Sequence, residues 1–248
     1  MSIAAYRGGW AGIENSKLKI QNSKKRHLVC PMTASLFLDV FAVGPIQANC
    51  ALLGDADAGE LVIIDPGEEA EKIADHVRTS GLRPTMILHT HGHLDHVGGT
   101  AELARLIGGN LPIGLHPDEI DLYRNAPMQA QMFGLEVEAP PEPDLMLRHG
   151  ETVAVGGLEL EVRHTPGHSP GGVCFVVSGA AEPVVIVGDV LFAGSIGRTD
   201  LMGGSFPVLE QSIREQLYTL PDDTRVVCGH GPDTTIGRER ASNPFVSG

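Results

Sequence analysis

The stretch ILHTHGHLDHVGG, residues 87–99, places four histidines and one aspartate within eight positions, from His89 to His96. On an α-helix, the side chains of His91 and His93 would point roughly 200° apart and could not share one ion, whereas in a loop or at a strand end positions i and i+2 face the same way. We therefore expect this stretch to form a loop after a buried strand.

Asp95 and His96 follow this pair and would lie close to the N-terminus of a helix that we expect over residues 98–109. Because these two residues are adjacent, their side chains point in different directions from the first pair. This arrangement suits two metal ions better than one.

Other predicted strands also end on residues that bind metals. LELEVRHTPGH delivers His168 just past its strand, PVVIVGD ends on Asp189, and RVVCGH ends on His230. Ligand pockets in sheet proteins lie at strand ends. Each residue alone would be an ordinary loop or capping residue, but imidazole and carboxylate groups at four separate strand ends predict a dinuclear metal site.

Hydrophobic periodicity places the chain in the α/β class, because predicted strands and helices interleave throughout. Short apolar runs from Leu36 to Ile64 predict strands joined by hairpins. Helices are expected over 68–81, 98–109 and 208–220. Further strands are expected over 84–90, 183–192 and 224–231, with a hairpin about Gly156–Gly157 within 151–168.

Charge is unevenly distributed. Residues 1–31 carry six basic side chains and one acidic one, a balance of +5; because the whole chain carries −13, residues 32–248 carry −18. Such an acidic surface repels phosphate backbones, so nucleic acid is not expected as a partner. No stretch reaches the roughly 18 apolar residues of a membrane span, so we expect no membrane association.

The first 31 residues are polar and rich in lysine, without the apolar core of an export signal or a convincing transit-peptide helix. We expect residues 1–31 to form a disordered extension and residues 32–248 to form a single domain that opens at Met32.

The cysteines show no CxxC spacing and are typical of small core residues in a reducing compartment, so we expect a cytoplasmic location. They are Cys30, Cys50, Cys174 and Cys228. Ser169 and Ser195 have no triad context, and covalent catalysis is not expected.

The remaining histidines are not expected to bind metal. His27, His76 and His149 are predicted to be solvated, in the extension, on a helix and in a turn. His89, His116 and His164 flank the candidate ligands and are expected to be hydrogen-bonded strand-end residues, with a supporting role as the alternative.

The motifs THGHLDH, HTPGHSPGG, GDVLF and GHGP resemble, in this order, the metal-binding signature of the metallo-β-lactamase fold superfamily. Within it, GSIGRTDLMGGS and GRERASNPF look like the short, single-domain relatives of hydroxyacylglutathione hydrolase, also called glyoxalase II. The resemblance covers nearly all of residues 33–248. It implies a four-layer αββα sandwich of two mixed β-sheets, with the metals along one edge.

The resemblance also implies a ligand set. One metal ion would be held by His91, His93 and His168, the other by Asp95, His96 and His230, and Asp189 would bridge them. Two divalent ions are expected, with zinc as the first choice and iron or manganese as alternatives. Asp95 would also orient the nucleophile as a catalytic residue. Arg198, in the loop after Asp189, is a candidate to bind a substrate carboxylate or else to stabilise that loop.

Hydrolysis is the chemistry that such a site suits. Two cations about 3.5 to 4 Å apart can hold a bridging hydroxide and stabilise an oxyanion, and a thiolate leaves without a strong acid because thiol pKa values lie near about 8.5. We predict hydrolysis of a small-molecule thioester such as S-D-lactoylglutathione. Full-length glyoxalase II enzymes carry a C-terminal helical domain that helps to hold glutathione, whereas this chain stops eighteen residues beyond His230, which leaves the thiol open.

Two other reactions stay open. Persulfide dioxygenases resemble this family closely and use a single iron held by two histidines and one aspartate, which would be His91, His168 and Asp189 here. Hydrolysis of a β-lactam or of another ester or amide is the further alternative. The sequence does not fix the acyl group, the metal or the oligomeric state.

Overall fold

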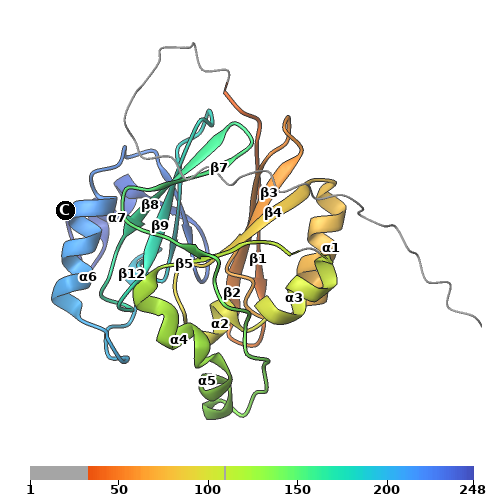
Figure 1. Ribbon diagram of the computed structural model, residues 1–248. Coiled ribbons are helices and arrows are strands. Elements are labelled where there is room, and N and C mark those ends of the chain that lie inside the picture. The colour runs from red at the N-terminus through yellow and green to blue at the C-terminus, as the bar shows by residue number, and fades with distance from the viewer. Residues whose placement is uncertain (1–32, 109) are drawn as a thin grey trace, which may run out of the picture.

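A computed structural model describes residues 33–108 and 110–248, and Figure 1 shows two β-sheets packed face to face between helices. The predicted extension, residues 1–31, lies outside the described residues, together with Cys30 and His27. In the described part each main sheet has six strands.

The first sheet has the order β1-β2-β3-β4-β5-β6. Its strands are β1 (Leu36–Val43), β2 (Ala48–Asp55), β3 (Glu60–Ile64), β4 (Arg83–Leu88), β5 (Ile113–Leu115) and β6 (Leu145–Met146). The pairs β1–β2 and β2–β3 are antiparallel, which confirms the predicted hairpins. From β3 onward the neighbouring strands are parallel, because helical segments return the chain to the same end of the sheet.

The second sheet has the order β14-β13-β10-β9-β8-β7. Its strands are β7 (Thr152–Val155), β8 (Leu158–His164), β9 (Val173–Ser178), β10 (Val184–Gly188), β13 (Arg225–Cys228) and β14 (Thr234–Thr235). The predicted hairpin turns at Gly156–Gly157. Its strand β8 buries Leu158, Leu160 and Val162 and turns the residues between them outward, so the expected alternation is confirmed.

An apolar layer joins the two sheets. Leu53, Val62 and Ile64 of the first sheet pack with Leu160 and Phe175 of the second, and all five side chains are almost fully buried. Because neighbouring residues of a strand face opposite sides of the sheet, the residues that alternate with these five face the outer side of each sheet.

Helices cover both outer faces, as Figure 1 shows. Against the first sheet lie α1 (Ala70–Ser80) and α3 (Thr100–Ile107), and against the second lie α6 (Phe206–Ser212) and α7 (Ile236–Ser242). Ile73 and Leu103 belong to the first outer core, and Leu209 and Ile213 to the second. The four-layer αββα sandwich of two mixed sheets is therefore confirmed. Within the described ranges, no helix combines the length and apolarity needed to cross a bilayer.

One predicted helix is confirmed and one predicted strand is divided in the structure. The helix expected over 98–109 is α3, and a separate turn of helix, α2 (Leu94–Val97), precedes it. The run 183–192 is not one strand, because a turn closed by the Val190 N–H on the Val187 carbonyl, at 3.3 Å, follows β10. Beyond this turn β11 (Leu191–Phe192) pairs with β12 (Ser195–Ile196).

Other helical segments differ from the expectation or were not expected. The helix expected over 208–220 changes from α-helical α6 to the π-helical segment η2 (Ile213–Leu217). The segments η1 (Pro117–Glu119), α4 (Ile120–Arg124) and α5 (Ala126–Met132) have no clear apolar period in the sequence. In Figure 1, α4 and α5 lie at the bottom of the view beside α2, at the edge where the site is found.

Candidate metal centre

The loop after β4 carries the first two histidines. The central position of β4 between parallel neighbours fixes where this loop begins. His91 and His93 are in the predicted loop, and their ring centroids lie 4.7 Å apart. The expectation of a loop is wrong for Asp95 and His96, because these two residues lie within the helical turn α2. The ring centroid of His96 lies 4.2 Å from that of His91, so this turn places the second pair directly beside the first.

The first donor group consists of His91, His93 and His168, whose nitrogen atoms lie within 4.8 Å of one another. His168 comes from the turn after β8, in the second sheet. Its Nε2 atom lies 2.9 Å from Nδ1 of His93. The structure thus brings together three imidazoles from the two sheets at one edge of the sandwich.

The second donor group consists of Asp95, His96 and His230. Oδ2 of Asp95 lies 3.1 Å from Nε2 of His230 and 3.7 Å from Nε2 of His96. His230 follows β13, and its backbone forms an isolated bridge with Ala48 of the first sheet. This bridge fixes the His230 loop of the second sheet against β2 of the first sheet.

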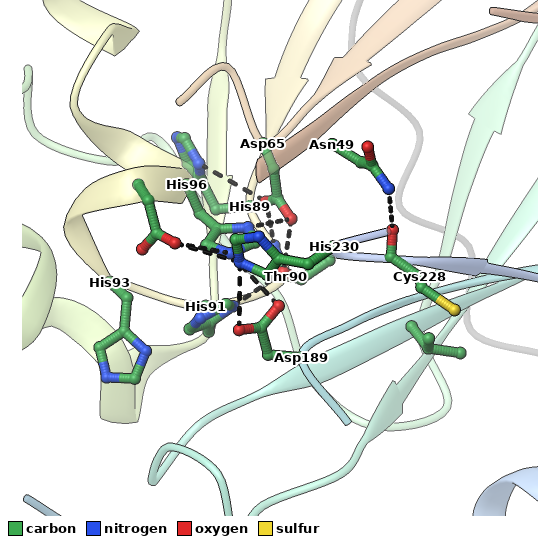
Figure 2. A network of polar contacts seen from close by, with 12 residues as sticks. Asn49, Asp65, His89, Thr90, His91, His93, His96, Asp189, Cys228 and His230 are labelled. Atoms are coloured by element: carbon green, nitrogen blue, oxygen red, sulfur yellow. Dashed lines mark hydrogen bonds and ion pairs between the residues drawn. The ribbon is translucent and has the colours of Figure 1, made fainter. Parts of the chain in front are cut away.

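Asp189 lies between the two groups, directly after β10. Its Oδ1 is 3.3 Å from Nε2 of His96, and its Oδ2 is 3.5 Å from Nε2 of His230 and 3.6 Å from Nε2 of His168. Figure 2 shows this carboxylate facing the imidazoles, with the His93 ring to one side of the dashed contacts. Asp189 therefore contacts members of both groups.

Buried atoms of this centre lack hydrogen-bond partners. Nε2 of His91 is inaccessible to solvent and has none among the described residues. Nε2 of His96 and Oδ1 of Asp189 are also inaccessible and have none beyond the ion pair that they form with each other. Unpaired buried polar atoms are costly, and native proteins pair them with other groups, water or ions. Converging imidazole and carboxylate donors of this kind fit divalent transition-metal ions.

Hydrogen bonds behind the imidazoles fix which nitrogen faces the centre. When Nδ1 is bonded to a carboxylate or carbonyl, Nε2 is left free for a metal. The pairs are His96 with Oδ2 of Asp65 at 3.0 Å, His168 with the Arg198 carbonyl at 2.8 Å, and His230 with the Gln47 carbonyl at 3.2 Å.

Asp65 is a residue of this site that the sequence reading missed. It follows β3, is buried, and accepts hydrogen bonds from the Thr90 N–H at 2.8 Å and the Thr90 hydroxyl at 2.6 Å as well as from His96. Figure 2 shows it beside His96 and His89. The signal was present, because the apolar run LVII ends on this aspartate just as VVIVG ends on Asp189.

The first donor group is neutral at pH 7. Burial, and then the neighbouring His96, hold the pKa of His91 well below its usual value. Burial, and then His168, lower the pKa of His93 to about 4. Burial also lowers the pKa of His168, although Asp189 opposes this. Neutral imidazole is the form that binds metal ions.

The second donor group is charged. Burial opposes the charged form of His96, but Asp189 and Asp95 raise its pKa well above the usual value. Burial likewise opposes the charge on His230, but hydrogen bonds to the same two carboxylates raise its pKa to about 9. Burial opposes the charge on Asp189, but His96, His230 and His91 together hold the pKa of this carboxyl well below its usual range.

Metal binding at the second group is therefore expected to strengthen between pH 6 and pH 8, while binding at the first group changes little. A cation that binds this group must displace the proton of His230 below pH 9 and the proton of His96 as well, each at a cost of about tenfold in affinity for each pH unit. His93 has already lost its proton in this range. Zinc titrations of the metal-free protein at pH 6, 7 and 8 would measure both affinities. The same pH dependence at both groups would contradict this charge assignment.

The predicted environments of the histidines outside the two donor groups are only partly confirmed. The prediction of a solvated His76 is only partly correct: its side chain is 35% exposed, but Nδ1 lies 2.7 Å from Oδ2 of Asp39 and the ring stacks on Phe41 at 3.7 Å. His149 is exposed, as predicted. His89 is fully buried beside Tyr123.

The remaining strand-end pair, His116 and His164, stacks in parallel with ring centroids 4.3 Å apart. Nδ1 of His116 accepts the Asp118 N–H, and Nε2 of His164 lies 3.2 Å from the Pro170 carbonyl. Both histidines are hydrogen-bonded strand-end residues, as expected.

Among the described residues, the cysteine thiols and the Ser169 hydroxyl are inaccessible to a substrate. Cys50, Cys174 and Cys228 are buried free thiols. Burial raises the pKa of Cys174 to about 12, so this thiol is protonated at neutral pH. The Ser169 hydroxyl is buried.

Comparison with known proteins agrees with this geometry. The model of the metallo-beta-lactamase superfamily matches residues 43–230. The chain is 43% identical over 208 residues to the probable metallo-hydrolase YqgX of Bacillus subtilis, covering 83% of this chain and 95% of that protein. It is 39% identical over 211 residues to the hydroxyacylglutathione hydrolase GloC of Haemophilus influenzae, covering 85% of this chain and 98% of GloC.

Two solved structures share the fold. The di-iron-bound form of TTHA1623 is 42% identical with a TM-score of 0.75, over 84% of this chain and all of that one. The BLEG-1 B3 metallo-beta-lactamase is 37% identical with a TM-score of 0.78, over 86% of this chain and all of that one. Since the family model runs from the end of β1 to His230 and these relatives match over nearly their whole length, the chain belongs to the metallo-β-lactamase superfamily.

Proposed function

We propose that this protein is a hydrolase that uses two metal ions to cleave a small-molecule thioester such as S-D-lactoylglutathione. The observation that carries the proposal is the position of Asp189, whose two oxygens contact His96 on one side and His168 and His230 on the other. The similarity to GloC, a hydroxyacylglutathione hydrolase, supports the thioester class and a glutathione-derived substrate.

The ligand sets follow the two donor groups. His91, His93 and His168 would hold one ion, Asp95, His96 and His230 the other, and Asp189 would contact both. Two bound divalent cations supply Lewis acidity, which makes water acidic near neutral pH and stabilises negative charge on the thioester oxygen. Zinc is the first choice for these donors; iron is the next, supported by the di-iron-bound form of TTHA1623, followed by manganese.

Asp95 is proposed as the catalytic residue that orients the attacking water. Its Oδ2 lies 3.1 Å from Nε2 of His230, and its side chain is 17% exposed, so the carboxylate can accept a hydrogen bond from a water molecule in the site. The leaving thiolate needs no strong acid because thiol pKa values lie near about 8.5.

Arg198 is proposed to bind an anionic group of the substrate. Its guanidinium group is exposed and forks onto both oxygens of Asp200 at 2.8 Å. Because an exposed ion pair contributes little, a substrate carboxylate can replace Asp200. Its carbonyl meanwhile orients His168, which ties this loop to the first donor group.

A substrate panel tests the proposal. Enzyme of measured metal content is assayed with S-D-lactoylglutathione, other anionic thioesters, neutral thioesters, a β-lactam and glutathione persulfide. Hydrolysis of at least one thioester is expected, with kcat/KM in the usual enzymatic range of about 10⁴ to 10⁸ M⁻¹s⁻¹. Preference for anionic thioesters would support the role of Arg198. Failure to hydrolyse any thioester would overturn the proposed function.

One alternative has a specific observation in its favour. The 37% identity to BLEG-1, a B3 metallo-beta-lactamase, favours β-lactam hydrolysis as the second candidate. We rank a persulfide dioxygenase lower, because a single iron held by His91, His168 and Asp189 would leave the second donor group without a metal to bind.

We also propose a cytoplasmic location, supported by the buried free thiols.

A further inference from the structure

A buried carboxylate outside the ligand set connects the two loops that carry the three histidines of the first donor group. Glu119, the last residue of η1, is fully buried. Its Oε2 accepts the Gly92 N–H at 2.7 Å, and its Oε1 accepts the Gly171 N–H at 2.6 Å. Gly92 stands between two of the histidines, and Gly171 lies in the turn that carries the third.

The loop at Gly92 and the turn at Gly171 both pack so closely against residues 116–123 that only glycine fits at these two positions. A Cβ atom at Gly92 would lie 2.9 Å from the Tyr123 nitrogen and 3.0 Å from the Glu119 carbonyl. A Cβ atom at Gly171 would lie 2.6 Å from Nδ1 of His116 and 3.0 Å from Cγ of Glu119. The segment from His116 to Tyr123 therefore acts as a spacer between the loops, and the Glu119 carboxylate bonds to both.

The contacts of Glu119 indicate that it acts through the backbone. Its oxygens are directed at two backbone N–H groups inside the protein. Charge-assisted bonds of a carboxylate to N–H groups are short and strong. Gln129 of α5 also supports the first loop, through the Gly92 carbonyl at 3.1 Å and the Leu94 N–H at 3.1 Å. Of these two side chains, Glu119 is the one that also bonds to the Gly171 turn.

We propose that Glu119 is a positioning residue that sets the distance between the Gly92 loop and the Gly171 turn, and so preforms the His91, His93 and His168 site before a cation binds. This inference rests on the metal ligands given under the proposed function. Glu119 lies 27 positions from Gly92 and 52 positions from Gly171 in the chain. Outer partners that orient ligands in this way typically contribute about 10- to 100-fold to metal affinity or activity.

The test is Glu119→Gln in the full chain, with its metal removed and cobalt added back. The amide NH₂ group would face a backbone N–H, so one of the two hydrogen bonds is lost while the shape is kept. Cobalt absorption and calorimetry are expected to show an affinity about 10- to 100-fold weaker at the first donor group. Binding at the second group is expected to change by less than about threefold. The matched control is Glu142→Gln, an exposed residue that bonds to Arg124, the last residue of α4, and is expected to have no effect.

The outcomes separate this inference from the proposed function. Unchanged cobalt affinity in Glu119→Gln, or an equal loss at both groups, would overturn the positioning role while two-ion binding by the wild type stands. A wild-type protein that binds no cation would overturn the proposed function as well.

If Glu119→Gln does not fold, hydrogen exchange on the metal-free wild type decides. The Gly92 and Gly171 amides are expected to exchange at least about 100-fold more slowly than the exposed Met202 amide. Exchange of both amides as fast as that of Met202 would contradict a preformed site.

Discussion

Replacing Asp189 with alanine is expected to lower kcat/KM for the thioester substrate by about 10³-fold or more. Outer partners of metal ligands already contribute about 10- to 100-fold, and Asp189 itself lies within 3.6 Å of imidazole nitrogens from both donor groups. Its loss removes the negative charge between the two proposed cations. Steady-state kinetics, together with the metal content of the purified variant, would measure the effect.

Asp222→Ala is the control for this variant. Asp222 is 74% exposed, pairs with Arg240 at 2.9 Å and precedes β13 at the end opposite His230, so its removal is expected to leave kcat/KM within about twofold. Asp189→Asn keeps an oxygen but not the charge, and it is also expected to lose metal. An Asp189→Ala enzyme that keeps more than a tenth of wild-type kcat/KM would show that this carboxylate is not the central ligand.

Removing the metal with a chelator is expected to reduce thioester hydrolysis to the uncatalysed background, and two equivalents of cation per chain are expected to restore it. Among the described residues, the thiols and the Ser169 hydroxyl are buried and offer no substitute for the metal. Rebinding is also expected to stabilise the fold, by about 2.7 kcal/mol for each ion when free metal is 100-fold above its Kd.

Activity and unfolding, both followed against the number of ions bound, would measure this effect. Addition of magnesium serves as the control, because Mg²⁺ prefers oxygen donors and is expected not to restore activity at a site with five imidazoles. Full activity in protein that retains less than about 0.1 ion per chain would contradict the metal-dependent mechanism.

Much of the sandwich could be predicted from local patterns. The alternation in β8 and the apolar runs of β3 and β10 determine which faces are buried, and burial of those faces brings the two sheets together. The donors could be proposed for a related reason, because imidazole or carboxylate groups at the ends of apolar strands have few other uses in such number. The family resemblance supplied the division of the donors into two groups.

Other features depend on contacts that no local pattern reveals. The helical turn that contains Asp95 is only four residues long and has no apolar period. His76 was read as solvated because its helix has a polar face there, yet Asp39 of β1 lies 37 positions away in sequence and pairs with it. Glu119 looks like an ordinary acidic residue at the start of a helix, and only the fold brings two glycine N–H groups to it.

The most direct test measures metal content, thioester hydrolysis and oxygen consumption on the same preparation of the enzyme. Two ions per chain are predicted, with hydrolysis that proceeds at the same rate with and without oxygen. One iron per chain, with oxygen consumed on glutathione persulfide and no thioester cleaved, would contradict a dinuclear hydrolase.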